Sequence, residues 1–88
     1  MNNGQPINEQ RVAEVRELVS KIIKIPADQI DPHANLFSDL GVDSLLGVEV
    51  FAALDRKYGI NVPEEKLRNI NTVIDIARLV DELKVVSK

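Results

Sequence analysis

Apolar residues recur at helical spacing in the first quarter of the chain. From about Glu9 to Lys24 they lie three or four positions apart and form one stripe: Val12, Val15, Val19, Ile22 and Ile23. This period predicts an amphipathic helix with one buried face. Asn8 is the expected N-cap. Pro26 ends the helix at or before Ile25, because the residue preceding a proline avoids helical geometry.

The periodicity is lost between Pro26 and Val42, which predicts a loop with one short helical turn near residues 27–30. A loop of this length is unusual in so short a chain and favours a functional segment. Four apolar side chains are expected to hold it on the core: Ile30, Leu36, Phe37 and Leu40.

A second helix is predicted from about Ser44 to Lys57, with Asp43 as its N-cap and Gly59 as its C-cap. The residues expected to pack against the core are Val48, Val50, Phe51 and Leu54. A third, short helix is expected to begin with Pro63 at its first position and to run to about Asn69.

The last helix is predicted from about Val73 to Val85, opened by a capping box of Thr72 and Asp75. Its inner stripe is Val73, Ile76, Ala77, Val80 and Leu83. Nothing in the chain alternates as a strand does. We therefore expect an all-α fold, a four-helix bundle with three main helices and one short third helix, in a single domain over residues 1–88. Its ends, about 1–7 and 86–88, are expected to fray.

Composition narrows the function classes. The chain has 88 residues, no cysteine and only three aromatic residues, with a net charge of −3. Proteins that bind nucleic acid need a basic face or a set of aromatic residues on which bases stack, so a nucleic-acid-binding function is disfavoured. No apolar run is long enough to span a membrane and no basic region precedes one as in a signal peptide. We expect a cytoplasmic monomer with no metal site.

Acidic residues are concentrated in one third of the chain. No Lys or Arg occurs between Ile25 and Leu54, and five acids lie there, which we call the acidic block: Asp28, Asp31, Asp39, Asp43 and Glu49. Asp55 follows directly. Such a block is either a solvated face or a docking surface for basic partners.

Ser44 lies inside this block, after a glycine-containing turn and at the expected start of a helix. A serine hydrolase would need a histidine base, and the only histidine is His33, with no nucleophile-elbow pattern around Ser44. A phosphate ester suits the position better, because free N–H groups at a helix N-terminus favour negative charge. The alternative from the local residues alone is that Ser44 is a second capping residue beside Asp43.

The run Leu40-Gly41-Val42-Asp43-Ser44-Leu45 resembles the phosphopantetheine attachment motif of acyl carrier proteins, in which Asp-Ser-Leu opens the second helix. Further segments agree at the right spacing: Phe37 and Asp39, Val48-Glu49, Ile60-Asn61-Val62-Pro63 and Ile70-Asn71-Thr72-Val73. The resemblance covers roughly Val12 to Leu83.

The resemblance implies an acyl-carrier-like bundle that is no enzyme and has no catalytic residue. A phosphopantetheinyl transferase would move 4′-phosphopantetheine from coenzyme A onto Ser44, and the arm would hold acyl groups as thioesters. Partners would be acyl-loading, ketosynthase or acyltransferase-type enzymes with basic docking patches, in fatty acid, polyketide or specialised lipid biosynthesis. The residues implied in partner recognition are Asp39, Asp43, Leu45, Leu46, Glu49 and Ala52.

Two positions depart from carriers of general fatty acid synthesis. Leu46 stands where an acid commonly follows Asp-Ser-Leu, and Ala52 stands where a larger apolar residue is common. These departures favour a specialised discrete carrier, and we expect Leu46 to be at least partly exposed beside the arm. Two alternatives stay open: a peptidyl or aminoacyl carrier, D-alanyl carriers included, and a non-catalytic helical interaction module.

Overall fold

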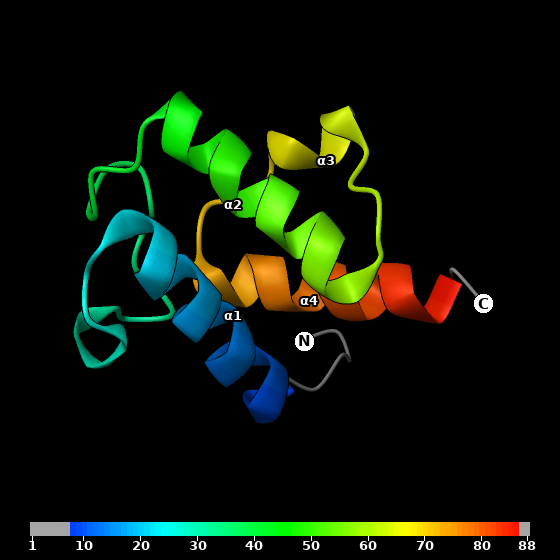
Figure 1. Cartoon of the computed structure of the whole chain (residues 1–88), viewed down its shortest axis with the longest axis horizontal. Coiled ribbons are helices and arrows are strands. Elements are labelled where there is room, and N and C mark those ends of the chain that lie inside the picture. The colour runs from blue at the N-terminus through cyan, green and yellow to red at the C-terminus, as the bar shows by residue number, and fades with distance from the viewer. Residues whose placement is uncertain (1–7, 87–88) are drawn as a thin grey trace.

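The computed structural model describes residues 8–86, and this part of the chain is helical with no strand. The α-helices are α1 (Glu9–Ile23), α2 (Ser44–Tyr58), α3 (Glu64–Leu67) and α4 (Val73–Val86), with a short 3₁₀ turn η1 (Ala27–Gln29) after α1 (Figure 1). The all-α expectation of three long helices and a short third one is confirmed. The ends expected to fray lie outside the described residues, except Val86, which closes α4. Across residues 8–86, no helix combines the length and the apolar character needed to cross a membrane.

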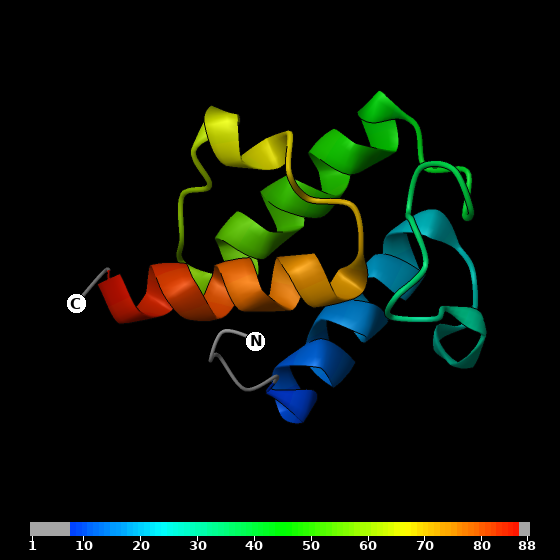
Figure 2. The same cartoon turned by 180° about the vertical axis from the view of Figure 1, so that it is seen from behind.

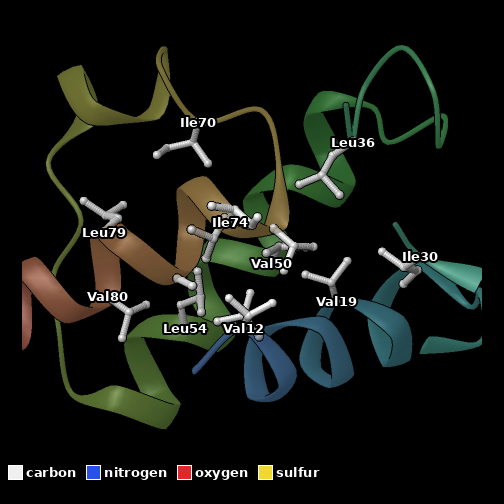
Figure 3. Packing of buried hydrophobic residues seen from close by; sticks show 14 of the residues in the cluster. Val12, Val19, Ile30, Leu36, Val50, Leu54, Ile70, Ile74, Leu79 and Val80 are labelled. Carbon is white, nitrogen blue, oxygen red and sulfur yellow. The ribbon is translucent and has the colours of Figure 1, made fainter. Parts of the chain in front are cut away.

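Helix α1 packs against both α2 and α4, and α2 also meets α4, whereas α3 stands apart from the other helices (Figures 1 and 2). The core lies between the three long helices. Figure 3 shows Val12 of α1, Leu54 of α2 and Val80 of α4 gathered in this space. Burial of aliphatic side chains supplies the main stabilisation, at about 25 cal/mol for each Å² removed from water.

The helix starts are set by side chains that accept orphan backbone N–H groups. Asn8 Oδ1 accepts the N–H of Arg11 at 3.1 Å, and Asp43 Oδ1 accepts that of Leu46 at 2.8 Å. At the start of α4 the Thr72 hydroxyl accepts the N–H of Asp75 at 3.0 Å, while the Asp75 carboxylate accepts that of Thr72 at 3.2 Å. All three caps expected from the sequence are confirmed.

The helix ends agree less closely. Gly59 closes α2 in the left-handed conformation as expected, but α1 ends one residue early because Lys24 takes the same conformation at φ 66°. Helix α3 begins at Glu64 with Pro63 as its N-cap rather than its first residue. It ends at Leu67 rather than near Asn69, because the following amides bond to carbonyls three residues back, which tightens the turn and stops the α-helix.

The long loop before α2 is anchored to the start of α4. The N–H of Leu36 donates to Asn71 O at 2.7 Å, and the N–H of Ile74 donates to Pro32 O at 3.3 Å. The side chains of Ile30 and Leu36 are buried, as expected, and Leu40 packs against the core. The loop is therefore part of the packed structure, and it fixes the position at which α2 begins.

A polar cluster joins the three long helices at the C-terminal end of α2. Arg11 pairs with Asp81 at 2.7 Å and with Glu14 at 3.0 Å, and its guanidinium lies 4.9 Å from the centre of the Tyr58 ring. The Tyr58 hydroxyl donates to Glu14 Oε1 at 2.8 Å. Burial raises the pKa of Tyr58, so its hydroxyl keeps the proton it donates. We call these four residues the Arg11 cluster.

Candidate functional site

Ser44 is the first residue of α2 and its side chain is exposed. The helix is capped by Asp43, whose carboxylate takes the N–H of Leu46 at 2.8 Å. Within the described part of the chain the Ser44 hydroxyl makes no hydrogen bond. Ser44 is therefore not a second cap, and its hydroxyl is available to solvent.

Two features of the preceding turn place Ser44 at the surface. Gly41 has φ of +74°, a left-handed conformation that is costly for residues with a Cβ. One residue later the side chain of Val42 is buried, and its N–H donates to Leu36 O at 2.9 Å. The chain is thus fixed at Val42 and turns outward, so that Asp43 and Ser44 are presented at the rim.

Three members of the acidic block, Asp39, Asp43 and Glu49, are close to the start of α2 in the sequence, whereas Asp28 belongs to η1 and lines a cavity with Arg16 of α1. All five members of the block are exposed, and no ion pair within residues 8–86 includes any of them. Two shape the loop, since Asp31 accepts the N–H of His33 and Asp39 that of Asn35, both at 2.9 Å. Glu49 makes no hydrogen bond to the described chain. Asp39, Asp43 and Glu49 are therefore exposed negative charges without an ion-pair partner in the described chain.

Three apolar side chains lie exposed close to Ser44 in the sequence and form what we call the apolar patch: Phe37 at 40% exposure, Leu45 at 69% and Val48 at 65%. The expectation that Val48 packs in the core is wrong. Val48 lies two residues from the inward-facing Leu46 and Val50, and two residues turn a helix by about 200°. The expectation that Phe37 holds the loop on the core is also wrong, because Phe37 is exposed and is not part of the hydrophobic core.

Leu46 and Ala52 differ in their burial. Leu46 is half-buried and packs against the core, so its expected partial exposure holds only in part, and the exposed leucine of the pair is Leu45. Ala52 is exposed on α2, on the side that faces a cavity. Val50 and Leu54 are buried and Phe51 is half-buried, as packing positions should be.

The cavity has a volume of about 470 Å³ and lies between α2 and α3. Helix α2 contributes six residues to the lining: Ser44, Gly47, Val48, Phe51, Ala52 and Asp55. The remaining lining comes from Phe37 of the loop, Val62 and Leu67. Neither this cavity nor its lining residues Val62 and Leu67 were predicted from the sequence. The available signal was the pair of small residues, Gly47 and Ala52, on the same side of α2 as Ser44.

His33 does not belong to this site. It lines a different cavity, between α1 and the start of α4, together with Arg16 and Pro32. No histidine is among the residues that line the α2–α3 cavity with Ser44. The arrangement offers an exposed, unused hydroxyl beside an apolar cavity and an acidic surface, and it lacks the constellation of a hydrolase.

Comparison with known proteins agrees with this geometry. A family described as "Phosphopantetheine attachment site" matches residues 13–80. The acyl carrier protein of Helicobacter pylori strain G27 is 31% identical over 72 residues, which cover 82% of this chain and 92% of that protein. The acyl carrier protein of Acidothermus cellulolyticus is 33% identical over 67 residues, 76% of this chain and 80% of that protein.

A solved structure of the acyl carrier protein from Enterococcus faecalis has a TM-score of 0.70 with this chain at 25% identity, and the match covers 85% of this chain and 95% of that one. Its fold is the acyl-carrier-like bundle expected from the sequence. The extent of the family match and the coverage of these relatives lead to one conclusion: the chain belongs to the acyl carrier proteins, which bear a 4′-phosphopantetheine arm and act as carriers rather than enzymes.

Proposed function

We propose that Ser44 is the residue to which a phosphopantetheinyl transferase attaches the 4′-phosphopantetheine arm. The proposal rests on the different roles of two adjacent residues at the start of α2, Asp43 and Ser44. Asp43 caps the helix, and the exposed Ser44 hydroxyl has no partner in the described chain. A hydroxyl that neither caps nor packs can be esterified without loss of a structural contact.

The helix terminus also suits the charge of a phosphodiester. The N–H groups of Ser44 and Leu45 make no hydrogen bond to the described part of the chain. Free N–H groups at the start of a 15-residue helix carry the positive end of its dipole, which favours an anion there. The residues present therefore fit the arm at its point of attachment.

The arm supplies a thiol, which this chain lacks because it has no cysteine. On that thiol acyl groups are held as thioesters and are presented to enzymes of fatty acid, polyketide or specialised lipid biosynthesis. The protein contributes the attachment point and the surface by which those enzymes recognise it.

That surface combines the apolar patch with the acidic block. Leu45 and Val48 offer exposed apolar area, and Asp39, Asp43 and Glu49 offer negative charge without a counter-charge. It suits the basic docking patch of a transferase, ketosynthase, acyltransferase or acyl-loading enzyme. Ala52 at the cavity and the half-buried Leu46 complete the proposed recognition set. Because like charges on a second copy would repel, the same surface favours a monomer.

The test is intact mass after incubation with coenzyme A and a promiscuous phosphopantetheinyl transferase. The wild-type chain should gain the mass of one arm, and Ser44→Ala should gain none while it stays folded, because Asp43 still caps α2. Ser38→Ala is the matched control, since Ser38 is exposed in the neighbouring loop. Modification that survives Ser44→Ala would overturn the proposal.

A further inference from the structure

Asn35 and Asp39, in the loop before α2, are joined by hydrogen bonds in both directions. The N–H of Asn35 donates to Asp39 Oδ2 at 2.9 Å, and the Asn35 carbonyl accepts the N–H of Asp39 at 2.9 Å. The side-chain oxygen of Asn35 also accepts the N–H groups of Phe37 and Ser38, at 2.8 and 2.9 Å. The arrangement is that of a capping box with the acid one position later, built on a single turn of chain. We call residues 35–40 the capped turn.

The capped turn is attached both to the bundle and to α2. The side chain of Leu36 is buried (Figure 3), and its N–H donates to Asn71 O at 2.7 Å. The Leu36 carbonyl accepts the N–H of Val42 at 2.9 Å, two residues before α2 begins. A Cβ added at Gly47 would lie 3.8 Å from Cε1 of Phe37, so the ring of Phe37 rests against the first turn of α2. The position of that first turn therefore depends on the capped turn.

Asp39 differs in this respect from Glu49, another exposed acid near the start of α2. Glu49 makes no hydrogen bond to the described chain, so a change there alters charge alone. One oxygen of Asp39 accepts the N–H of Asn35, so a change at Asp39 alters the capped turn as well. The turn needs an acceptor atom at this position rather than a charge, because an amide oxygen accepts the same N–H group. Geometry and charge can therefore be separated at Asp39.

Transfer of the arm is sensitive to the position of the Ser44 oxygen. This oxygen bonds to the phosphorus of the phosphopantetheine group, the bond from that phosphorus to the departing adenosine bisphosphate breaks, and the hydroxyl proton passes to a base of the transferase. The attacking and leaving oxygens must lie nearly in line. A shift of about 1 Å can slow such a reaction by about 100-fold. Whatever holds the start of α2 in place therefore affects the rate of transfer.

We propose that Asn35 and Asp39 are positioning residues for transfer of the arm: through the capped turn they hold the start of α2, and with it the Ser44 hydroxyl, in the place where the transferase uses it. The inference rests on the proposed attachment of the arm at Ser44. It gives Asp39 a second role, in which the hydrogen bond to Asn35 contributes more to transfer than the charge does. The role of Asn35 is geometric alone, since its side chain is neutral.

The experiment separates geometry from charge with two variants at each position. Asn35→Ala removes the side-chain acceptor without altering the net charge, whereas Asn35→Ser keeps a capping oxygen. Asp39→Ala removes both the acceptor and the charge, whereas Asp39→Asn keeps an acceptor and removes only the charge. Steady-state transfer at saturating coenzyme A and varied carrier concentration gives kcat and KM for each variant. Urea unfolding shows which variants are folded under the assay conditions.

Two further variants are matched controls. Asn61→Ala and Asp28→Ala make the same chemical changes at exposed positions whose side chains form no hydrogen bond or ion pair within the described chain. Both should keep the wild-type kcat.

Asn35→Ala should lower kcat about five-fold and leave KM unchanged, because the docking charges stay in place while the hydroxyl is displaced. Asn35→Ser should restore kcat to within about two-fold of wild type. Asp39→Ala should lower kcat as far as Asn35→Ala does, and the double alanine variant no further, because both residues act through one turn. Asp39→Asn should keep kcat within about two-fold of wild type and raise KM slightly, as loss of a docking charge would.

The proposal is overturned if Asp39→Asn lowers kcat as far as Asp39→Ala, since the charge would then be what transfer requires. A wild-type kcat in Asn35→Ala overturns it as well. If an alanine variant does not fold, the conservative variant at the same position decides: an unchanged kcat supports the proposal and a five-fold loss overturns it. A failure of the proposed function is distinguishable, because the wild-type chain would then gain no mass.

Discussion

The charged side chains at the two ends of α2 differ in whether they are paired within the chain. Near the N-terminal end, Asp39, Asp43 and Glu49 are exposed and none of them is paired with a base in the described chain. At the C-terminal end, the Arg11 cluster joins α1, α2 and α4 through hydrogen bonds of 2.7 to 3.0 Å. The charged residues of the Arg11 cluster link the three long helices. The acids near the start of α2 have no ion-pair partner within the described chain and can interact with other molecules.

Because the two ends differ in exposure, we expect the charged residues at one end to affect stability and those at the other not to. The Arg11 side chain is only 18% exposed, so its pairs are partly shielded from water and salt. Exposed carboxylates are well hydrated without a partner, so leaving them unpaired costs little. The stability of the bundle should therefore depend on one end, and its association with partners on the other.

The largest expected effect is at the Arg11 cluster. Arg11→Ala removes the pairs with Glu14 and Asp81 and the contact with the Tyr58 ring. It leaves the half-buried carboxylate of Asp81 without its partner, while Glu14 keeps only the hydrogen bond from Tyr58. We expect a loss of about 2 kcal/mol in the free energy of unfolding. Urea unfolding measures the loss, and transfer of the arm to the folded variant should proceed at the wild-type rate.

Lys66→Ala is the control for this change, because the ion pair of Lys66 with Glu82 is exposed, at 39% and 55% for the two side chains. Its loss should change the free energy of unfolding by no more than about 0.5 kcal/mol. If the two variants lose equal stability, the Arg11 cluster stabilises the fold no more than an exposed ion pair does. The proposed difference between the two ends of α2 would then be wrong.

A smaller effect is expected at the acidic end. Glu49→Lys should slow transfer of the arm roughly five-fold at low salt, because it places a positive charge opposite a basic partner. Its stability should be unchanged, since Glu49 is exposed and makes no contact with a base. Wild-type transfer should itself slow as salt is added.

Glu17→Lys supplies the matched charge reversal at an exposed position of α1, outside the acidic block. Its transfer rate should stay close to that of the wild-type chain. Equal slowing by both variants would show that net charge matters and that no localised docking surface exists.

The smallest effect concerns pH. The hydrogen bond from Tyr58, aided by the charge of Arg11, holds the pKa of Glu14 below its ordinary value of 4.5. A carboxylate with a lowered folded-state pKa contributes stability above about 4.5, and this contribution is lost as the pH falls through the folded-state value. The gap in unfolding free energy between wild type and Tyr58→Phe should therefore narrow below pH 4.5. Urea unfolding of both proteins at pH 7 and at pH 3.5 measures it, and a gap that stays constant contradicts the mechanism.

Features set by neighbouring residues could be predicted from the sequence. The caps at Asn8, Asp43 and Thr72 each act within three residues, and their helices begin where expected. The position of Ser44 followed from the same local reasoning. The left-handed Lys24 could not be predicted, because lysine has no preference for that conformation.

Features set by distant residues were missed. Arg11 and Asp81 are 70 positions apart, and Tyr58 and Glu14 are 44 apart, so only the packing of three helices reveals the cluster. The α2–α3 cavity depends on α3 standing away from α2, which no local pattern encodes. Val48 was misplaced because an apolar residue on a helix was taken to face the core, and an exposed apolar side chain is no rarity on a protein surface.

The charges at the two ends of α2 also form an electric dipole along this helix. Helix α2 is 15 residues long, about 22 Å, with Asp43 as its N-cap and Arg56 and Lys57 in its last turn. In dilute salt a positively charged partner would exert a torque on the approaching chain and turn its Ser44 end forward before contact. At physiological ionic strength, where the screening length of about 8 Å is much shorter than the helix, this torque fades and each end acts on its own surroundings. A partner bound at the acidic end is then unaffected by the basic end. The two proteins must find the productive orientation by random rotation after they meet, because the field no longer orients them beforehand.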